Sequence, residues 1–76
     1  MNPQHIKDML DRRPFVPFRV VTSSGQSYDI RHPEMALVTK NTLFVGINSA
    51  GDTIPEDGKI VSILHVTGLE ALQQVA

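Results

Sequence analysis

The chain contains no cysteine and no tryptophan, and its only aromatic residues are three phenylalanines and one tyrosine. Without cysteine, neither a disulfide framework nor a thiolate metal site can stabilise the fold. A chain of 76 residues can form one domain with a small core. The remaining common source of stability is oligomerisation, which hides apolar surface that a single copy leaves exposed. The composition therefore predicts a single domain, residues 1–76, that forms a homo-oligomer.

The sequence also lacks an excess of either charge and lacks long apolar runs. Its formal net charge is −1 and its pI is about 6.2, so the field of the whole protein would not attract nucleic acid strongly. Any RNA or DNA site would have to be a local patch. No run is long and apolar enough to span a bilayer, and the N-terminus has no signal-peptide core. We therefore expect a cytoplasmic protein without a membrane partner.

Residue patterns typical of enzymes are missing as well. His5, His32 and His65 fall on separate predicted elements, with no spacing typical of metal ligands. The serines near the first predicted turn have no nucleophile context, and the five glycines occur singly, as turn residues do, rather than in a phosphate-binding loop. We expect a protein that is not an enzyme, with no catalytic residues, no metal site and no cofactor.

The stretch Arg13–Val21 marks the boundary between a helix and a β-rich body. Asn2-Pro3 is a good helix start, and an apolar stripe then recurs at three- and four-residue spacing, which predicts a helix over about residues 3–12. Pro14 disfavours helical geometry at the residue before it, and after Pro17 the pattern changes to alternation. Phe15 and Phe18 are large enough to fix the helix on the sheet.

Short apolar runs separated by turn residues predict about five antiparallel strands over residues 18–72. Predicted turns are Ser24-Gly25, Lys40-Asn41 and Thr67-Gly68, and Asn48–Lys59 is predicted to be a polar loop. The last segment is compatible with a strand or a helical turn, and its position favours a strand. The runs from which these strands are expected to form are Phe18–Ser23, Gln26–His32, Met35–Thr39, Thr42–Ile47 and Ile60–Val66, with Leu69–Leu72 as the short last segment.

We therefore predict a mainly β fold with an N-terminal α-helix, in which the strands form a small, strongly bent, five-stranded antiparallel barrel. Alternation along the runs selects the side chains that face its interior. The predicted core residues are Phe15, Phe18, Val20, Tyr28, Ile30, Leu37, Val45, Ile60, Ile63 and Leu69.

Two resemblances accompany this prediction. The pattern Arg13-Pro14-Phe15, Pro17-Phe18, Gly25 and His32-Pro33-Glu34 resembles a family of small bacterial proteins of unassigned function. The order of elements resembles the Sm-like fold of the bacterial RNA chaperone Hfq. The segments that resemble it are Met9-Leu10 with Arg12-Arg13, Val20–Gly25, Met35–Thr42 and Ile63–Val66. An SH3-like barrel would have nearly the same strand count.

The Sm-like resemblance implies a ring of copies that binds single-stranded RNA. It places His65 at a base, where that family carries a Lys-His pair, although Leu64 replaces the lysine here. Arg31 or Lys40 would then contact phosphates. Independently of the resemblance, Lys7, Arg12 and Arg13 are either a small basic patch for phosphates or part of a solvated helix face, since Asp8 and Asp11 lie among them. His65 could instead be a structural histidine that packs within its strand. The alternative function is a protein-interaction or assembly module without a nucleic-acid role, in which exposed strand edges pair.

Overall fold

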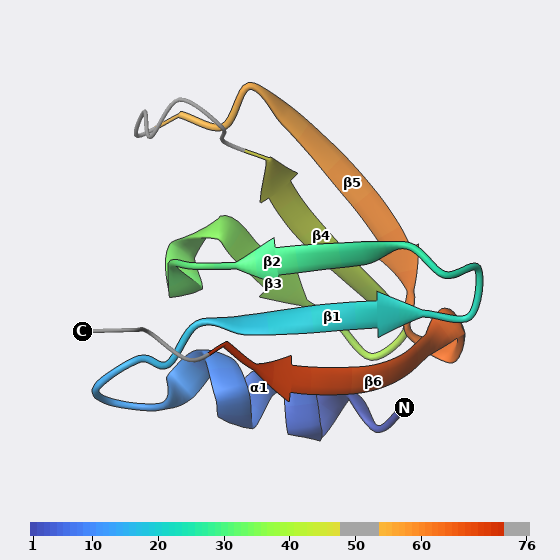
Figure 1. Ribbon diagram of the computed structural model, residues 1–76, viewed down its shortest axis with the longest axis horizontal. Coiled ribbons are helices and arrows are strands. Elements are labelled where there is room, and N and C mark those ends of the chain that lie inside the picture. Colours follow the sequence, from blue (N-terminus) through green and yellow to red (C-terminus); the bar gives the residue numbers. More distant parts are fainter. Residues whose placement is uncertain (48–53, 73–76) are drawn as a thin grey trace.

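The computed structural model describes residues 1–47 and 54–72, and this part of the chain contains one α-helix, six strands and two short 3₁₀ turns (Figure 1). The fold is mainly β with an N-terminal helix, as the sequence predicts. The elements in chain order are α1 (Pro3–Asp11), β1 (Phe18–Thr22), β2 (Ser27–Ile30), η1 (Pro33–Met35), β3 (Ala36–Val38), β4 (Thr42–Ile47), β5 (Asp57–Ser62), η2 (Ile63–His65) and β6 (Val66–Ala71).

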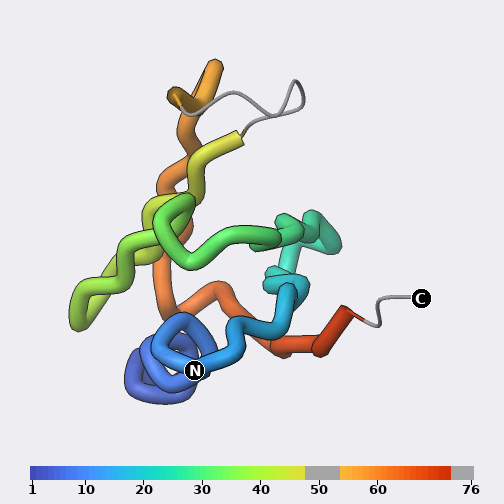
Figure 2. Tube along the Cα trace, turned by 90° about the vertical axis from the view of Figure 1, so that its left-hand side faces the viewer, coloured from blue at the N-terminus to red at the C-terminus, as the bar shows by residue number. Residues whose placement is uncertain are grey.

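The strands form two antiparallel sheets of three strands each. The β1 sheet has the order β2-β1-β6, and the β4 sheet has the order β3-β4-β5. Figures 1 and 2 show the two sheets as separate layers that cross at an angle. The prediction of a closed five-stranded barrel is wrong, because the described residues form six strands in two sheets with no hydrogen-bonded pairing between them.

Two sharp bends explain the difference. In η1, Pro33 cannot donate a ladder hydrogen bond, and the chain leaves β2 in one sheet and enters β3 in the other. In η2, a turn interrupts the run Ile60–Val66, which we predicted as one continuous strand. Main-chain hydrogen bonds from Ile63 N to Asn41 O (2.9 Å) and from Ser23 N to His65 O (2.8 Å) hold this bend against two other turns.

The strand bounds near these bends differ from the predicted ones. The Thr67-Gly68 turn is wrong, since both residues lie within β6 and Gly68 pairs with Val21 of β1. Part of the predicted polar loop belongs to β5, which begins at Asp57, and residues 48–53 of that loop lie outside the described residues. The Ser24-Gly25 turn is confirmed: Gly25 has a φ of 87° and donates its N–H to Thr22 O at 3.0 Å.

Helix α1 confirms the predicted start and end within one residue. Asn2 caps it, because its side-chain oxygen accepts a hydrogen bond from Gln4 N at 2.9 Å, and Pro3 occupies the first turn. At the other end, Arg13 Nη1 donates to the carbonyl oxygens of Leu10 (3.0 Å) and Arg12 (2.7 Å). A cation at this position also interacts favourably with the helix dipole.

The core lies between the two sheets and the apolar side of α1. Phe18, Val20, Ile30, Val45 and Ile63 are buried as predicted, and Phe15, Tyr28 and Leu69 pack against them as partly buried residues. The sequence prediction missed the buried residues Ile6, Leu10, Leu43, Val61 and Val66. It is wrong for Leu37 and Ile60, which are 63% and 75% exposed. Both pair with Phe44 in the β4 sheet and lie on its outer face.

The outer face of the β1 sheet carries charged residues. Arg19 pairs with Asp29 on one side and with Glu70 on the other. Arg19 Nε contacts Asp29 Oδ1 at 2.7 Å, and this hydrogen bond lowers the pKa of Asp29 below its usual value and raises that of Arg19. A carboxyl group with a lowered pKa in the folded state adds stability above its unfolded pKa and loses that contribution as the pH falls.

We expect the free energy of unfolding of Asp29→Asn to depend less on pH in acid than that of the parent protein. In the parent protein, the contribution of Asp29 should be complete at pH 7 and should decline below about pH 4, where an unfolded aspartate takes up its proton. The urea midpoint measured at pH 7 and pH 3 should therefore change less in the variant. Asp8→Asn, on the exposed side of α1, serves as control. If the urea midpoint changes between pH 7 and pH 3 as much in Asp29→Asn as in the parent, the stabilising role of the Arg19–Asp29 pair is contradicted.

Candidate functional site

His65 lies at the surface, in η2 rather than inside an apolar strand as predicted. Its Nδ1 is 3.5 Å from Ser23 Oγ. The side chain lines a cavity of about 330 Å³ between the β1–β2 turn and β5, which Tyr28, Ile60 and Ser62 also line. The cavity therefore combines two aromatic rings, several hydroxyl groups and one exposed apolar side chain, and it has no Lys, Arg, Asp or Glu in its lining.

Lys40 lies in the β3–β4 turn. This turn contacts η2 through the hydrogen bond from Ile63 N to Asn41 O, so Lys40 and His65 lie at the same end of the molecule (Figure 1). Lys40 lines a different cavity from His65, however, together with residues of α1.

The three other cations that the sequence singles out lie elsewhere. Arg12 and Arg13 follow α1 and Arg31 follows β2, and both of these ends lie opposite η2 (Figure 1). Arg13 Nη1 is bonded to main-chain carbonyl groups, and Arg31 Nη2 is 3.5 Å from Asp29 Oδ2. The predicted nucleic-acid residues therefore do not converge on one cationic patch around His65.

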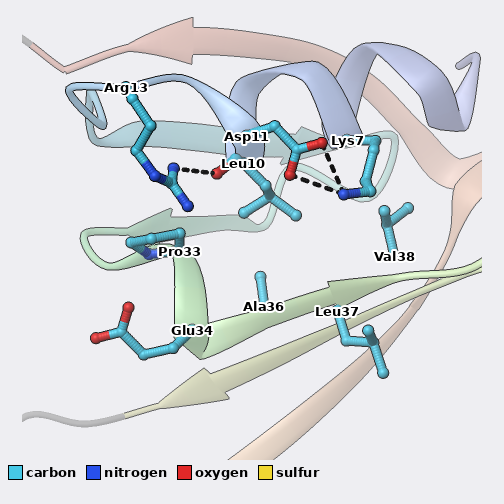
Figure 3. Close-up of a pocket in the computed structure, with 9 residues that line it drawn as sticks. All are labelled: Lys7, Leu10, Asp11, Arg13, Pro33, Glu34, Ala36, Leu37 and Val38. Carbon is cyan, nitrogen blue, oxygen red and sulfur yellow. Dashed lines mark hydrogen bonds and ion pairs between the residues drawn. The ribbon is translucent and has the colours of Figure 1, made fainter.

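A groove that the sequence did not reveal runs between α1 and β3; we call it the α1–β3 groove. It consists of two adjoining cavities of about 350 and 380 Å³ that share Lys7 and Val38. Figure 3 shows the first cavity, with Leu10 pointing toward β3 and the Arg13 guanidinium lying above Pro33. Lys7 forms an ion pair of 2.7 Å with Asp11 of the same helix. The sequence considered Lys7 only as part of a basic patch on the helix, because the approach of a helix to a strand is not visible in a local pattern.

The outer face of the β4 sheet carries an apolar row. Leu37, Phe44 and Ile60 pair across the three strands and are 63%, 40% and 75% exposed. They also line a shallow cavity of about 440 Å³, next to which Pro55 packs over Gly46. The outer face of the β1 sheet, in contrast, carries Arg19, Asp29 and Glu70.

Each sheet also ends in an edge strand of six residues, β5 in one sheet and β6 in the other. Neither edge is paired within the described residues. Exposed edges of this length present a row of unpaired N–H and C=O groups that can pair with another chain.

Two further observations on the described residues concern metal ions and the bilayer. No group of three or more His, Asp or Glu residues there could hold a metal ion. Over the same ranges, 1–47 and 54–72, no helix has the length and apolar character needed to span a bilayer. Comparison with protein-family models finds no match, and comparisons with curated proteins and with solved structures find none either.

Proposed function

We propose that this protein is a non-enzymatic interaction module that assembles by pairing β5 of one copy with β6 of the next. The observation that carries this proposal is the presence of two long open strand edges, one in each sheet, with the exposed apolar side chain of Ile60 on one of them. The charge of the whole chain agrees with this function better than with nucleic-acid binding.

The direction of the main-chain groups on each edge follows from the ladder. Ile63 N donates to Asn41 O, so these two residues form a hydrogen-bonded pair that continues the β4–β5 ladder. In an antiparallel ladder, hydrogen-bonded pairs alternate with non-bonded pairs, whose main-chain groups point away from the partner strand. Gly58, Ile60 and Ser62 therefore direct their main-chain groups away from β4. By the same alternation from Leu72 N to Pro17 O, the outward positions on β6, up to the register shift between Val21 and Thr22, are Leu69 and Ala71. The outward positions of the two strands can form one ladder between copies.

The other two edges are less suitable for pairing. Strand β2 has four residues and carries Asp29 at an outward position, and Arg31 and Pro33 follow within three residues of its end. Strand β3 has only three residues, too few for a continuous ladder between two copies. Short length, charge and proline are common ways in which proteins prevent unwanted pairing of edge strands. The open pair β5 and β6 is therefore the proposed assembly contact.

Pairing of two different edges is heterologous, so repeated contacts form a closed ring if the rotation between copies permits closure. The pairing of the first strand with the last, and the sharp bends within two long runs, support an Sm-like arrangement as the finer description of this fold. Fold alone does not define function, and the assembly proposal depends on the edges.

We expect Ile60→Lys to weaken self-association at least about tenfold, because a charged side chain beside the ladder disfavours edge pairing. Sedimentation equilibrium should show oligomers for the parent and a shift toward monomer for the variant. Leu64→Lys is a matched control, since Leu64 is 87% exposed but lies in η2, outside the edge. A parent protein that remains monomeric at high micromolar concentration would contradict the proposal.

The cavity beside His65 favours a second candidate, binding of single-stranded RNA. Tyr28 and His65 provide aromatic rings near hydroxyl groups, which suits a nucleobase, and the Lys40 turn lies at the same end. Titration with a labelled oligouridylate at low and high salt distinguishes the two functions. Binding that falls with salt and is lost in His65→Ala would support the RNA function. If no oligouridylate binds at low salt, assembly remains as the one proposed function.

A further inference from the structure

We propose that the α1–β3 groove binds an extended, acidic peptide segment of a partner protein, which adds a strand to the edge of β3. This site lies within one copy and does not use β5 or β6, so it is independent of the proposed assembly. It would give the module a binding site for a second protein.

The first argument is the direction of the main-chain groups of β3. Thr39 N donates to Thr42 O at 2.8 Å, which makes these two residues the bonded pair that closes the turn. By alternation, Leu37 bonds to Phe44, whereas Ala36 and Val38 direct their main-chain groups away from β4 and toward the groove. Ala36 N–H bonds to Pro33 O within η1. Among the described residues, no partner satisfies Val38 N–H, Val38 C=O or Ala36 C=O, so they are available to an added strand.

The second argument is the size and lining of the groove. Its two cavities, about 350 and 380 Å³, adjoin at Lys7 and Val38, and together they follow α1 from its first turn to its last. Leu10, Pro33 and Val38 form an apolar floor in the first cavity (Figure 3). A groove between a helix and an open strand edge accepts an extended chain, with main-chain hydrogen bonds on one side and an apolar side chain on the floor.

The third argument is charge. Asp11 is paired with Lys7, with both carboxylate oxygens 2.7 Å from Nζ. The unpaired charges along the groove are then Arg13 and Lys40 near its two ends and Glu34 on the η1 side. Arg13 uses only Nη1 for its carbonyl contacts, so Nε and Nη2 remain available to a carboxylate. Two cations against one carboxylate favour an acidic peptide over a basic one.

The same cations could attract RNA, but the rest of the groove favours a peptide. No aromatic side chain lines either cavity in the described part of the chain, so bases would have no ring on which to stack. Unpaired strand groups, in contrast, match the spacing of another peptide main chain. The peptide is therefore the occupant that uses all three features of the groove.

The probe is a fluorescent hexapeptide of alternating valine and glutamate with a blocked N-terminus, titrated into the parent protein at low salt. We expect saturable binding, with protection of the Val38 amide from hydrogen exchange and shifts of the Leu10 and Val38 signals in NMR spectra. Lys40→Glu should weaken binding about tenfold, because it reverses a charge in the exposed turn. Lys59→Glu, an exposed change on the opposite edge of the sheet, should leave binding unchanged.

Several results would overturn the proposal. These are no binding of the acidic hexapeptide at millimolar concentration, equal binding of the hexapeptide with lysine in place of glutamate, or binding without protection of Val38. Binding of a hexameric oligouridylate that shifts the same Leu10 and Val38 signals, while the peptide shifts neither, would assign the groove to RNA instead. Monomeric parent protein would contradict the assembly through β5 and β6 without affecting this test.

Discussion

Phe18→Ala should remove a large fraction of the stability of the protein. Phe18 is fully buried, and its ring lies 6.1 Å from that of Phe15, where the chain crosses from α1 into β1. Removing a buried phenylalanine side chain costs about 3–5 kcal/mol. A domain of this length has a total stability of roughly 4–11 kcal/mol, so the loss is a large fraction of it. Urea denaturation followed by circular dichroism should show a much lower midpoint.

Phe44→Ala is the matched control for this prediction. It removes the same side chain from the outer face of the β4 sheet, where Phe44 is 40% exposed. The expected loss of stability is clearly smaller, because less apolar surface is buried there and no closed cavity is created. Equal urea midpoints for the two variants would show that Phe18 is not the central core residue.

Ile6→Ala should cost about 2–5 kcal/mol and should loosen α1. Ile6 is buried in the same core cluster as Leu10, and these two side chains fix the helix against the sheets. A helix of nine residues is not stable alone in water, so its helical content depends on this packing. The variant should lose helical signal at lower urea concentration than the parent. Its control is Ile54→Ala, at an exposed isoleucine, and a similar loss in both variants would contradict the role of Ile6.

The sequence predicted the elements with strong local signals. Asn2-Pro3 and the apolar stripe define α1, and Ser24-Gly25 defines the first hairpin, because the chemistry of caps and turns acts within a few residues. The buried positions of β1 follow strict alternation and were predicted as well. These features depend on neighbours in the chain and need no knowledge of the rest of the fold.

The features that the sequence did not predict depend on distant contacts. Ile60 and Val61 are equally apolar, and only the pairing with β4 determines that Val61 faces the core and Ile60 faces outward. The bend at η2 depends on hydrogen bonds to Asn41 and Ser23, which are far away in the chain. The groove likewise arises where α1 meets β3, so no local pattern places Lys7 beside Val38.

The bends at η1 and η2 have a consequence for the way in which this molecule opens. Each of the two bent runs, β2–η1–β3 and β5–η2–β6, contributes an edge strand to both sheets. If one sheet separates, it pulls an edge strand from the other, so local opening of a whole sheet carries nearly the full cost of unfolding. Amide protons in β1 and β4, the two central strands, should therefore exchange with nearly equal free energies, as a single cooperative unit. The bends at η1 and η2 therefore couple the two small sheets into one cooperative unit.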